Sequence, residues 1–200
     1  IKVIKRKNFF IIFGKGIDGY NYKKNIVLNA KNSATLGRLI LGLLINSTET
    51  IKLIGDKSLS KRDFKRVAAP LSKFGAKFKL RNNYCLPLTI KGSKDINPIR
   101  YNETRGSAQC KSSVMLGAIR ANGTTYIKAK KSRDHTEKIM ENLNLPIQVI
   151  KKKNYDKIKI KKIKKIKNLN YNIPSDISSS AFFIVLTALS EKSELTIRNV

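Results

Sequence analysis

Apolar and polar positions along the chain follow patterns typical of short strands that alternate with amphipathic helices. Residues 50–55, 77–82 and 124–130 read as strands, whereas residues 32–44 place apolar side chains at the spacing of one helical face. Ser33, or the asparagine before it, is suited to cap this helix. The alternation predicts the α/β (α+β) fold class. The side chains expected on the buried helical face are Leu36, Leu39, Ile40, Leu43 and Leu44.

The order strand, helix, strand, helix, strand, strand occurs twice, over residues 29–100 and again over residues 101–170. The two copies share little sequence, so the repeat rests on the order of the elements. Residues 1–28 are interpreted as the end of an earlier copy, and together these copies form one domain. Residues 171–200 are interpreted as a crossover and the first elements of another domain, with an apolar helix capped by Asp176 or the serine before it.

The remaining helices are predicted from their starts and stops. In the first copy, we expect a single helix over residues 58–76, kinked at Pro70 and stopped at Gly75. In the second copy, Ser107 opens a helix of small side chains, and residues 132–145 form another helix. Asp134 and Glu137 have the spacing of a capping box at the start of this last helix.

Residues 14–19 read GKGIDG and directly follow an apolar run, which matches the glycine pattern of a dinucleotide-binding turn. That turn needs a helix at its third glycine and an acidic residue about 20 positions later. Here the chain continues polar and then strand-like, and no acidic residue lies between Asp18 and Glu49. We therefore interpret the glycines as a hairpin turn that closes the last strands of the partial first copy.

The formal net charge of the 200 residues is +29. A lysine-rich composition spread over solvated faces explains this charge better than a binding stripe, because arginine and interleaved aromatic residues are sparse. Residues 157–168, the most basic stretch, are interpreted in the same way, as an amphipathic strand followed by a linker. A basic nucleic-acid- or membrane-surface-binding module is the alternative function, and a steep salt dependence of nonspecific DNA binding would reveal it.

Cysteine and histidine are too rare for several kinds of site. Cys85, Cys110 and the single His135 lack the number and spacing for a disulfide framework or a zinc site. Cys110 is expected to pack in the core, and His135 is expected at a helix start and not as a general base. No apolar run approaches the roughly 20 residues of a membrane span. A reduced, cytoplasmic setting is therefore expected.

Four predicted helix starts combine hydroxyl, small and basic residues. Free N–H groups and the helix dipole favour anions at such positions, and Arg and hydroxyl side chains add charge-assisted hydrogen bonds. One such cluster is weak evidence, but several at equivalent positions of a repeat predict a pocket for a small, multiply anionic ligand. The clusters are residues 32–38, 58–63, 105–113 and 130–135.

At these same clusters the sequence resembles the enolpyruvyl transferase family. The resemblance is carried by NSATLGRLILGLL, GDKSLSKRDFKRVAAPLSKFGA, PLTIKG, GSAQCKSSVMLGAIRANGTT, SRDHTE and IPSDISSSAFFIV, which follow in the family's order. Within this series, the motif SAQ is followed by KS and then by SRDHTE. This order favours the branch that acts on shikimate 3-phosphate over the branch that acts on UDP-N-acetylglucosamine. The resemblance implies an inside-out α/β barrel domain built from repeated βαβαββ units, here truncated at both ends.

The resemblance also implies a reaction and its residues. The enolpyruvyl group of phosphoenolpyruvate would pass to shikimate 3-phosphate and release phosphate, in the biosynthesis of chorismate and aromatic amino acids. No metal or cofactor, no specific nucleic acid and no membrane is implied, and the full-length protein would be a monomer. Asp176 would be structural and Arg38 would line the site. Shikimate 3-phosphate would contact Ser107, Ala108 (through its backbone), Gln109, Ser132 and Arg133. Phosphoenolpyruvate would contact Ala34, Thr35, Arg62 and Gln109.

The sequence departs from the family pattern in two ways. Lys31 and Ala34 stand where the family usually has glycine, and an alanine at position 34 goes with tolerance of the inhibitor glyphosate. The family's acid–base residues and its N-terminal Lys-Ser…Arg motif are not found in the 200 residues. We therefore expect a fragment of the enzyme that holds no catalytic acid or base and is inactive by itself.

Overall fold

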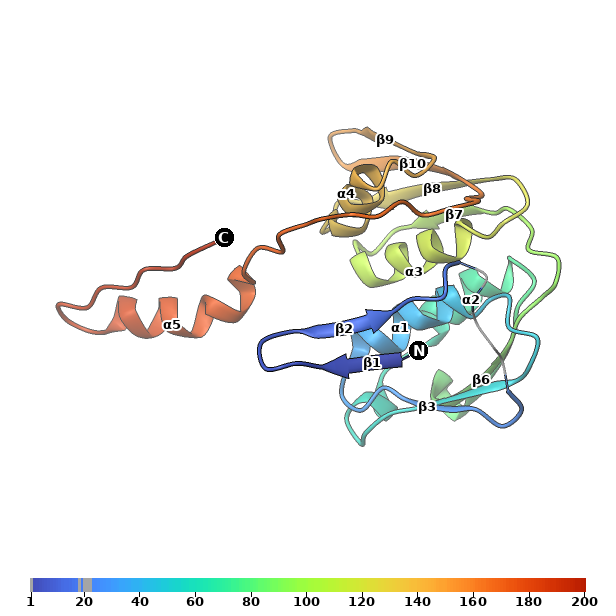
Figure 1. Ribbon diagram of the computed structural model, residues 1–200, viewed down its shortest axis with the longest axis horizontal. Coiled ribbons are helices and arrows are strands. Elements are labelled where there is room, and N and C mark those ends of the chain that lie inside the picture. The colour runs from blue at the N-terminus through green and yellow to red at the C-terminus, as the bar shows by residue number, and fades with distance from the viewer. Residues whose placement is uncertain (1, 18, 20–22) are drawn as a thin grey trace. The chain divides into compact units, whose positions relative to one another are not determined.

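The computed structural model describes residues 2–17, 19 and 23–200, and the chain divides into two units, Ile1–Lys167 and Asn168–Val200. In the first unit, helices lie between two four-stranded sheets, so the helices are inside and the sheets outside (Figure 1). Across the described residues these sheets do not close into a barrel. The α/β class with repeated units is confirmed, whereas the domain boundaries given above stay predictions.

The two sheets have the same topology. One has the order β3-β4-β6-β5 and the other the order β7-β8-β10-β9. In each, the first two strands are parallel and the remaining pairs are antiparallel. The strands of the first sheet are β3 (Val27–Asn29), β4 (Ile51–Ile54), β5 (Lys77–Arg81) and β6 (Cys85–Lys91). Those of the second are β7 (Arg100–Glu103), β8 (Thr124–Lys130), β9 (Ile147–Lys151) and β10 (Tyr155–Lys161).

The helices follow the predicted order with one exception. The single helix predicted over residues 58–76 is wrong, because Arg62 is extended, with φ −83° and ψ 147°. A short 3-10 helix precedes this residue, and an α-helix begins only at Lys65. Asp63 favours this break, because its Oδ1 accepts the N–H of Lys65 at 2.7 Å. The helices are α1 (Ala34–Leu43), η1 (Leu59–Lys61), α2 (Lys65–Ser72), η2 (Asn82–Tyr84), α3 (Ala108–Ala118) and α4 (His135–Asn142).

Helices α1 and α3 pack against each other and run in the same direction. Thr35 contacts Gln109 near the start of both helices, and Gly42 lies against Ser113 further along. A Cβ built on Gly42 would lie 2.1 Å from the Ser113 carbonyl oxygen, so glycine is required for this close approach. The close approach brings the first turns of the two helices side by side.

The predicted buried face of α1 is only partly right. Leu44 is buried, but Leu36 is 50% exposed and Leu41 is fully buried. The error arises because α1 packs on both α3 and α2, so more than one face of the helix is covered. A helix that is enclosed by neighbours does not show a single apolar stripe.

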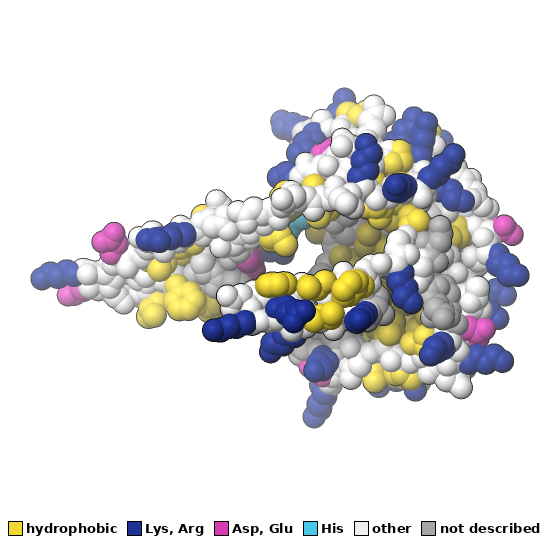
Figure 2. All heavy atoms as spheres, in the orientation of Figure 1, with side chains coloured by type: hydrophobic (Ala, Val, Ile, Leu, Met, Phe, Trp, Pro, Cys, Tyr) yellow, Lys and Arg dark blue, Asp and Glu magenta, His cyan; other side chains and the backbone are white. Residues whose placement is uncertain are grey.

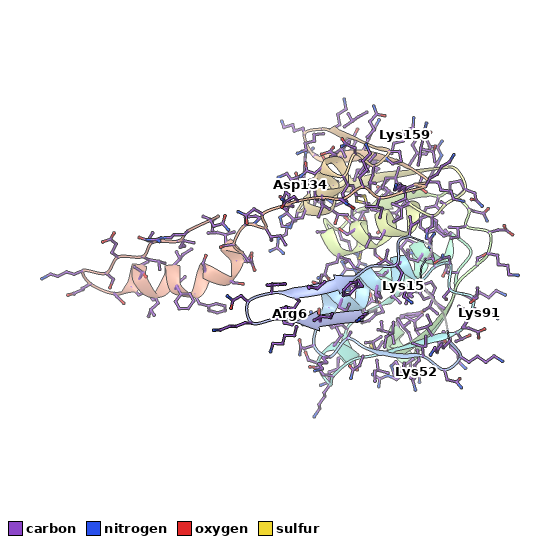
Figure 3. The ribbon with its side chains drawn as sticks, viewed as in Figure 1. Arg6, Lys15, Lys52, Lys91, Asp134 and Lys159 are labelled. Carbon is purple, nitrogen blue, oxygen red and sulfur yellow. The ribbon has the colours of Figure 1, made fainter. Side chains whose placement is uncertain are left out.

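The outer faces of the sheets carry lysine, and their inner faces carry the core. Along β10, Ile158 and Ile160 are buried in the common core. Lys52, Lys91 and Lys159 point outward from the sheets (Figure 3). The interpretation of the basic stretch as an amphipathic strand is therefore confirmed for β10. No helix in the described part of the chain is long and apolar enough to cross a membrane.

A hairpin of β1 (Lys2–Lys5) and β2 (Phe10–Phe13) precedes the glycine-rich segment. Its turn is closed by the N–H of Arg6, which donates to Phe9 O at 2.8 Å, so the prediction that GKGIDG forms the hairpin turn is wrong. Gly16 does have a positive φ of 73°, Asp18 lies outside the described residues, and the next helix begins only at Ala34. Apolar side chains along the hairpin reach the surface (Figure 2).

The second unit contains helix α5 (Ile177–Leu189). Asp176 is its N-cap: Oδ1 accepts the N–H of Ser178 at 2.9 Å and Oδ2 accepts the hydroxyl of Ser179 at 2.7 Å. The prediction that an Asp or Ser at this point caps an apolar helix is confirmed, with Asp176 in that place.

Candidate functional site

The first turns of α1 and α3 form the centre of the candidate site. Ser33 Oγ accepts the N–H of Leu36 at 3.1 Å, and Ser107 Oγ accepts the N–H of Cys110 at 3.3 Å, so both predicted serine caps are confirmed. Because the two helices are parallel neighbours, their N-terminal dipole charges add in one place. This arrangement attracts a negatively charged ligand.

A side-chain network joins the two helices across this centre. Arg38 Nη1 donates to Gln109 Oε1 at 2.5 Å, and Gln109 Nε2 donates to Thr35 Oγ1 at 2.8 Å. The backbone of Arg38 is also held, since Ser113 Oγ donates to its carbonyl oxygen at 2.8 Å. Three residues that the resemblance places around the substrates are therefore in direct contact, although Arg38 and Gln109 are 71 positions apart.

Positive charge is concentrated around Arg38. Burial lowers the pKa of its guanidinium most, and the nearby guanidinium groups of Arg66 and Arg62 lower it further. An arginine stays charged despite such shifts, so the site holds mutually repelling cations. Within the described chain, Arg38 Nε and Ser132 Oγ are buried polar atoms without a hydrogen-bond partner. Such atoms are rare in folded proteins and mark places where a ligand or water can bind.

Arg62 reaches this region from an exposed segment between η1 and α2. Asp56 shapes the segment: its Oδ1 accepts the N–H of Leu59 at 2.7 Å, and its Oδ2 accepts Asn32 Nδ2 at 2.5 Å. The hydrogen bond from Leu59 lowers the pKa of Asp56 most, and the Asn32 bond and the Arg62 charge act in the same direction. The segment therefore links the start of α1 to the arginine.

Ser132 and Arg133 lie in the loop between β8 and α4, which contacts α3. The side chain of Lys111 on α3 donates to the carbonyl oxygen of Arg133 at 2.9 Å. The capping box predicted for α4 is wrong, because Asp134 makes no side-chain cap and the Glu137 carboxylate pairs with Lys111 at 2.6 Å. Glu137 therefore forms an ion pair with a distant residue, Lys111, instead of the predicted local hydrogen bond at the start of its own helix.

The turn before α3 is fixed by a carboxylate that the sequence analysis did not single out. Glu103 is buried at the end of β7, and its Oε2 accepts the N–H of Gly106 at 2.6 Å. Gly106 has a φ of 72°, which suits glycine. An acidic residue that ends a strand just before a glycine and a helix cap is the local signal that could have found it.

The remaining expected residues are located by their positions in the helices and by their exposure. Ala34 is the first residue of α1 and its methyl packs against the hydrophobic core, and Ala108 is the first residue of α3. Cys110 is 2% exposed, which confirms a packing role, and His135 begins α4. Among residues 2–17, 19 and 23–200, no three His, Cys, Asp or Glu side chains cluster as metal ligands would. Residues that sequence reasoning missed are Asp56, Glu103, Lys111 and the pairing of Glu137.

Known proteins resemble the chain along nearly its whole length. The family model of EPSP synthase (3-phosphoshikimate 1-carboxyvinyltransferase) matches residues 2–200. The 3-phosphoshikimate 1-carboxyvinyltransferase of Caldicellulosiruptor saccharolyticus is 40% identical over 188 residues, which cover 92% of this chain and 43% of the relative. That of Leuconostoc mesenteroides is 40% identical and covers 94% of this chain and 43% of the relative.

A solved structure agrees with the sequence relatives. EPSP synthase from Acinetobacter baumannii superposes with a TM-score of 0.80 at 33% identity, over 95% of this chain and 42% of that structure. The chain thus spans less than half of the length of these proteins. The repeated topology, the paired helix starts and these matches agree, and the chain belongs to the EPSP synthase (3-phosphoshikimate 1-carboxyvinyltransferase) family.

Proposed function

We propose that this chain supplies part of the active site of an enzyme that transfers the enolpyruvyl group of phosphoenolpyruvate to shikimate 3-phosphate and releases phosphate. The observation that carries the proposal is the junction of α1 and α3, where Arg38, Gln109 and Thr35 are joined beside two helix N-termini. Both substrates are anions, and this junction offers dipoles, guanidinium groups and hydroxyls to them.

In this proposal shikimate 3-phosphate lies between the start of α3 and the loop before α4. Ser107 and Gln109 contact it from the helix, Ala108 contributes its backbone N–H, and Ser132 and Arg133 contact it from the loop. The buried Ser132 hydroxyl without a partner in the described chain supports this placement, because a ligand oxygen would satisfy it.

Phosphoenolpyruvate would lie beside the start of α1. Thr35 and Gln109 would contact it there, and Arg62 would clamp an anionic group with the planar, two-pronged geometry of a guanidinium. The Ala34 methyl is only partly buried against the core, and its remaining surface would narrow this pocket compared with glycine. We propose glyphosate tolerance on that basis. In the intact protein, Ala34→Gly should increase inhibition by glyphosate, and unchanged inhibition would refute this part.

The role of these residues is to hold two anions in contact. Bringing two reactants together in the correct geometry supplies a large share of an enzymatic rate. The proton-transfer groups would come from parts of the enzyme beyond these residues, so the 200-residue polypeptide alone should release no phosphate in a coupled assay. A cytoplasmic setting is part of the proposal, and the reduced state of Cys85 and Cys110 is consistent with it.

Calorimetric titration of the chain with shikimate 3-phosphate tests the proposal. We expect binding of shikimate 3-phosphate and much weaker binding of shikimate, because the phosphate provides the charge-assisted contacts. Ser107→Ala or Arg133→Met should weaken binding about tenfold or more, the usual effect of losing a hydrogen bond to a charged group. Arg6→Met is the matched control, because it removes one arginine from the exposed hairpin turn. If Arg6→Met and Arg133→Met weaken the binding of shikimate 3-phosphate equally, the effect comes from the overall charge of the chain and not from a specific site.

A further inference from the structure

Lys111 is a fully buried lysine on the second turn of α3. Its ammonium group lies 2.6 Å from Glu137 Oε1 and donates a hydrogen bond to the carbonyl oxygen of Arg133 at 2.9 Å. The Glu137 side chain is 3% exposed, so both charges are removed from water. A second contact runs alongside, since the hydroxyls of Ser112 and Thr136 lie 2.7 Å apart.

Stability alone does not explain this pair. Desolvation of two charges offsets much of their attraction, and well-packed apolar side chains in place of a buried pair are often as stable or more so. The pair does provide direction, because an ammonium group donates along defined angles and an apolar side chain donates nothing. Here one donor is directed at a backbone oxygen in the loop that carries Ser132 and Arg133.

The same lysine is also tied to the start of its own helix. The backbone N–H of Lys111 donates to the carbonyl oxygen of Ser107, the N-cap of α3, at 3.1 Å. Lys111 thus connects the helix start with Ser107 and Gln109 to the loop with Ser132 and Arg133. These are the two groups of residues between which the ligand is proposed to bind.

We propose that Lys111 and Glu137 are positioning residues. Glu137 supplies the counter-charge that keeps the Lys111 ammonium in the interior, and Lys111 fixes the Arg133 carbonyl and with it the Ser132–Arg133 segment relative to the first turn of α3. The consequence for shikimate 3-phosphate rests on the proposed function, whereas the ordering of the segment does not.

The test replaces the pair by apolar side chains of similar length, Lys111→Met with Glu137→Met. We expect a melting temperature within a few degrees of the unaltered chain, because the core stays filled. Amide hydrogen exchange in residues 131–134 should become about tenfold faster, because the segment loses its anchor. The affinity for shikimate 3-phosphate should fall by a similar factor. Lys138→Met, which removes only an exposed ion pair with Asp134, is the control and should change neither quantity.

The outcomes separate this inference from the proposed function. Unchanged exchange in residues 131–134 of a folded double variant would overturn the inference, and so would faster exchange with full affinity. If the unaltered chain does not bind shikimate 3-phosphate, the proposed function fails, and the exchange rates alone decide the positioning role. If the double variant does not fold, NMR of the unaltered chain decides. A slowly exchanging Lys111 ammonium close to Arg133 supports the inference, and its absence refutes it.

Discussion

The segment that leads into α2 is held by hydrogen bonds to the exposed residues Asp56 and Asp63, whereas the segment that leads into α4 is held by the buried Lys111–Glu137 pair. The two four-stranded sheets next to these segments have the same topology. Exposed polar contacts compete with water and contribute little individually, but a buried contact resists opening. One scaffold can therefore present Arg62 on an adjustable segment and Ser132–Arg133 on a fixed one.

The buried pair is the most sensitive point of this comparison. Glu137→Gln leaves the Lys111 ammonium without its counter-charge inside the protein, and we expect a loss of about 3–5 kcal/mol in the free energy of unfolding. Asp134→Asn is the matched change at the exposed ion pairs of the same helix, and it should cost less than about 1 kcal/mol. Urea denaturation of both variants measures the difference, and similar losses would contradict the distinction between buried and exposed anchoring.

The shared helix interface is the next most sensitive point, because both segments are positioned from it. Gly42→Ala would place a Cβ against the Ser113 carbonyl and push α1 from α3, so we expect a loss of about 1–3 kcal/mol. At Gly37 the nearest atom to a new Cβ is in the Phe64 ring at 3.4 Å. Gly37→Ala should therefore be neutral or stabilising by up to about 1 kcal/mol. Thermal denaturation measures the stability of both variants. If Gly37→Ala is less stable than Gly42→Ala, the close approach at Gly42 is refuted.

Limited proteolysis compares the two segments directly. Arg62 and Arg133 are both exposed and both precede an aspartate, so their peptide bonds are chemically matched trypsin sites. We expect cleavage after Arg62 to be about tenfold faster, since the Arg133 carbonyl is held by a charged donor worth about 1.5 kcal/mol. Mass spectrometry of early digestion products measures both rates. Equal rates would show that the two segments open with similar ease.

The smallest expected effect is on the stability of the chain at acidic pH. The pKa of Asp56 is lowered from its ordinary value of 3.8, chiefly by the hydrogen bond from Leu59. A carboxyl with a lowered folded-state pKa contributes stability above its unfolded pKa and loses it as the pH falls through the folded value. Asp56→Asn should therefore lie below the unaltered chain in stability near neutral pH and converge with it below pH 3.8. A difference in stability between Asp56→Asn and the unaltered chain that does not change with pH would contradict this prediction.

Local patterns were sufficient for most elements. The serine caps of α1 and α3, the strands over residues 50–55, 77–82 and 124–130 and the cap of α5 were all predicted, because each depends on neighbours within a few residues. Residues 27–29 were assigned to the hairpin of an earlier copy, but β3 pairs with β4 of the first sheet. The break at Arg62 was missed, although Asp63 acts locally, since the apolar spacing on both sides also fits one helix. The glycine-rich segment was rightly separated from a dinucleotide site but wrongly assigned to the hairpin turn.

Candidate site residues could be named from the sequence, but their contacts could not. Gln109 was expected near Thr35, yet nothing in the pattern places Arg38 on its amide oxygen. Lys111 was part of the predicted cluster of residues 105–113, but nothing in the sequence distinguishes it as a buried lysine. Its burial follows only from the packing of α4 on α3, which supplies the carboxylate that makes a buried ammonium tolerable.

The sequence by itself determined the elements, their repeated order and the chemical character of the helix starts, because capping, periodicity and turn chemistry act over a few residues. The tertiary structure decided which faces of α1 are buried, which helices approach through Gly42, and which carboxylate Lys111 meets. The physical reason is that these outcomes depend on groups dozens of positions apart, whose energies appear only when the core closes around them.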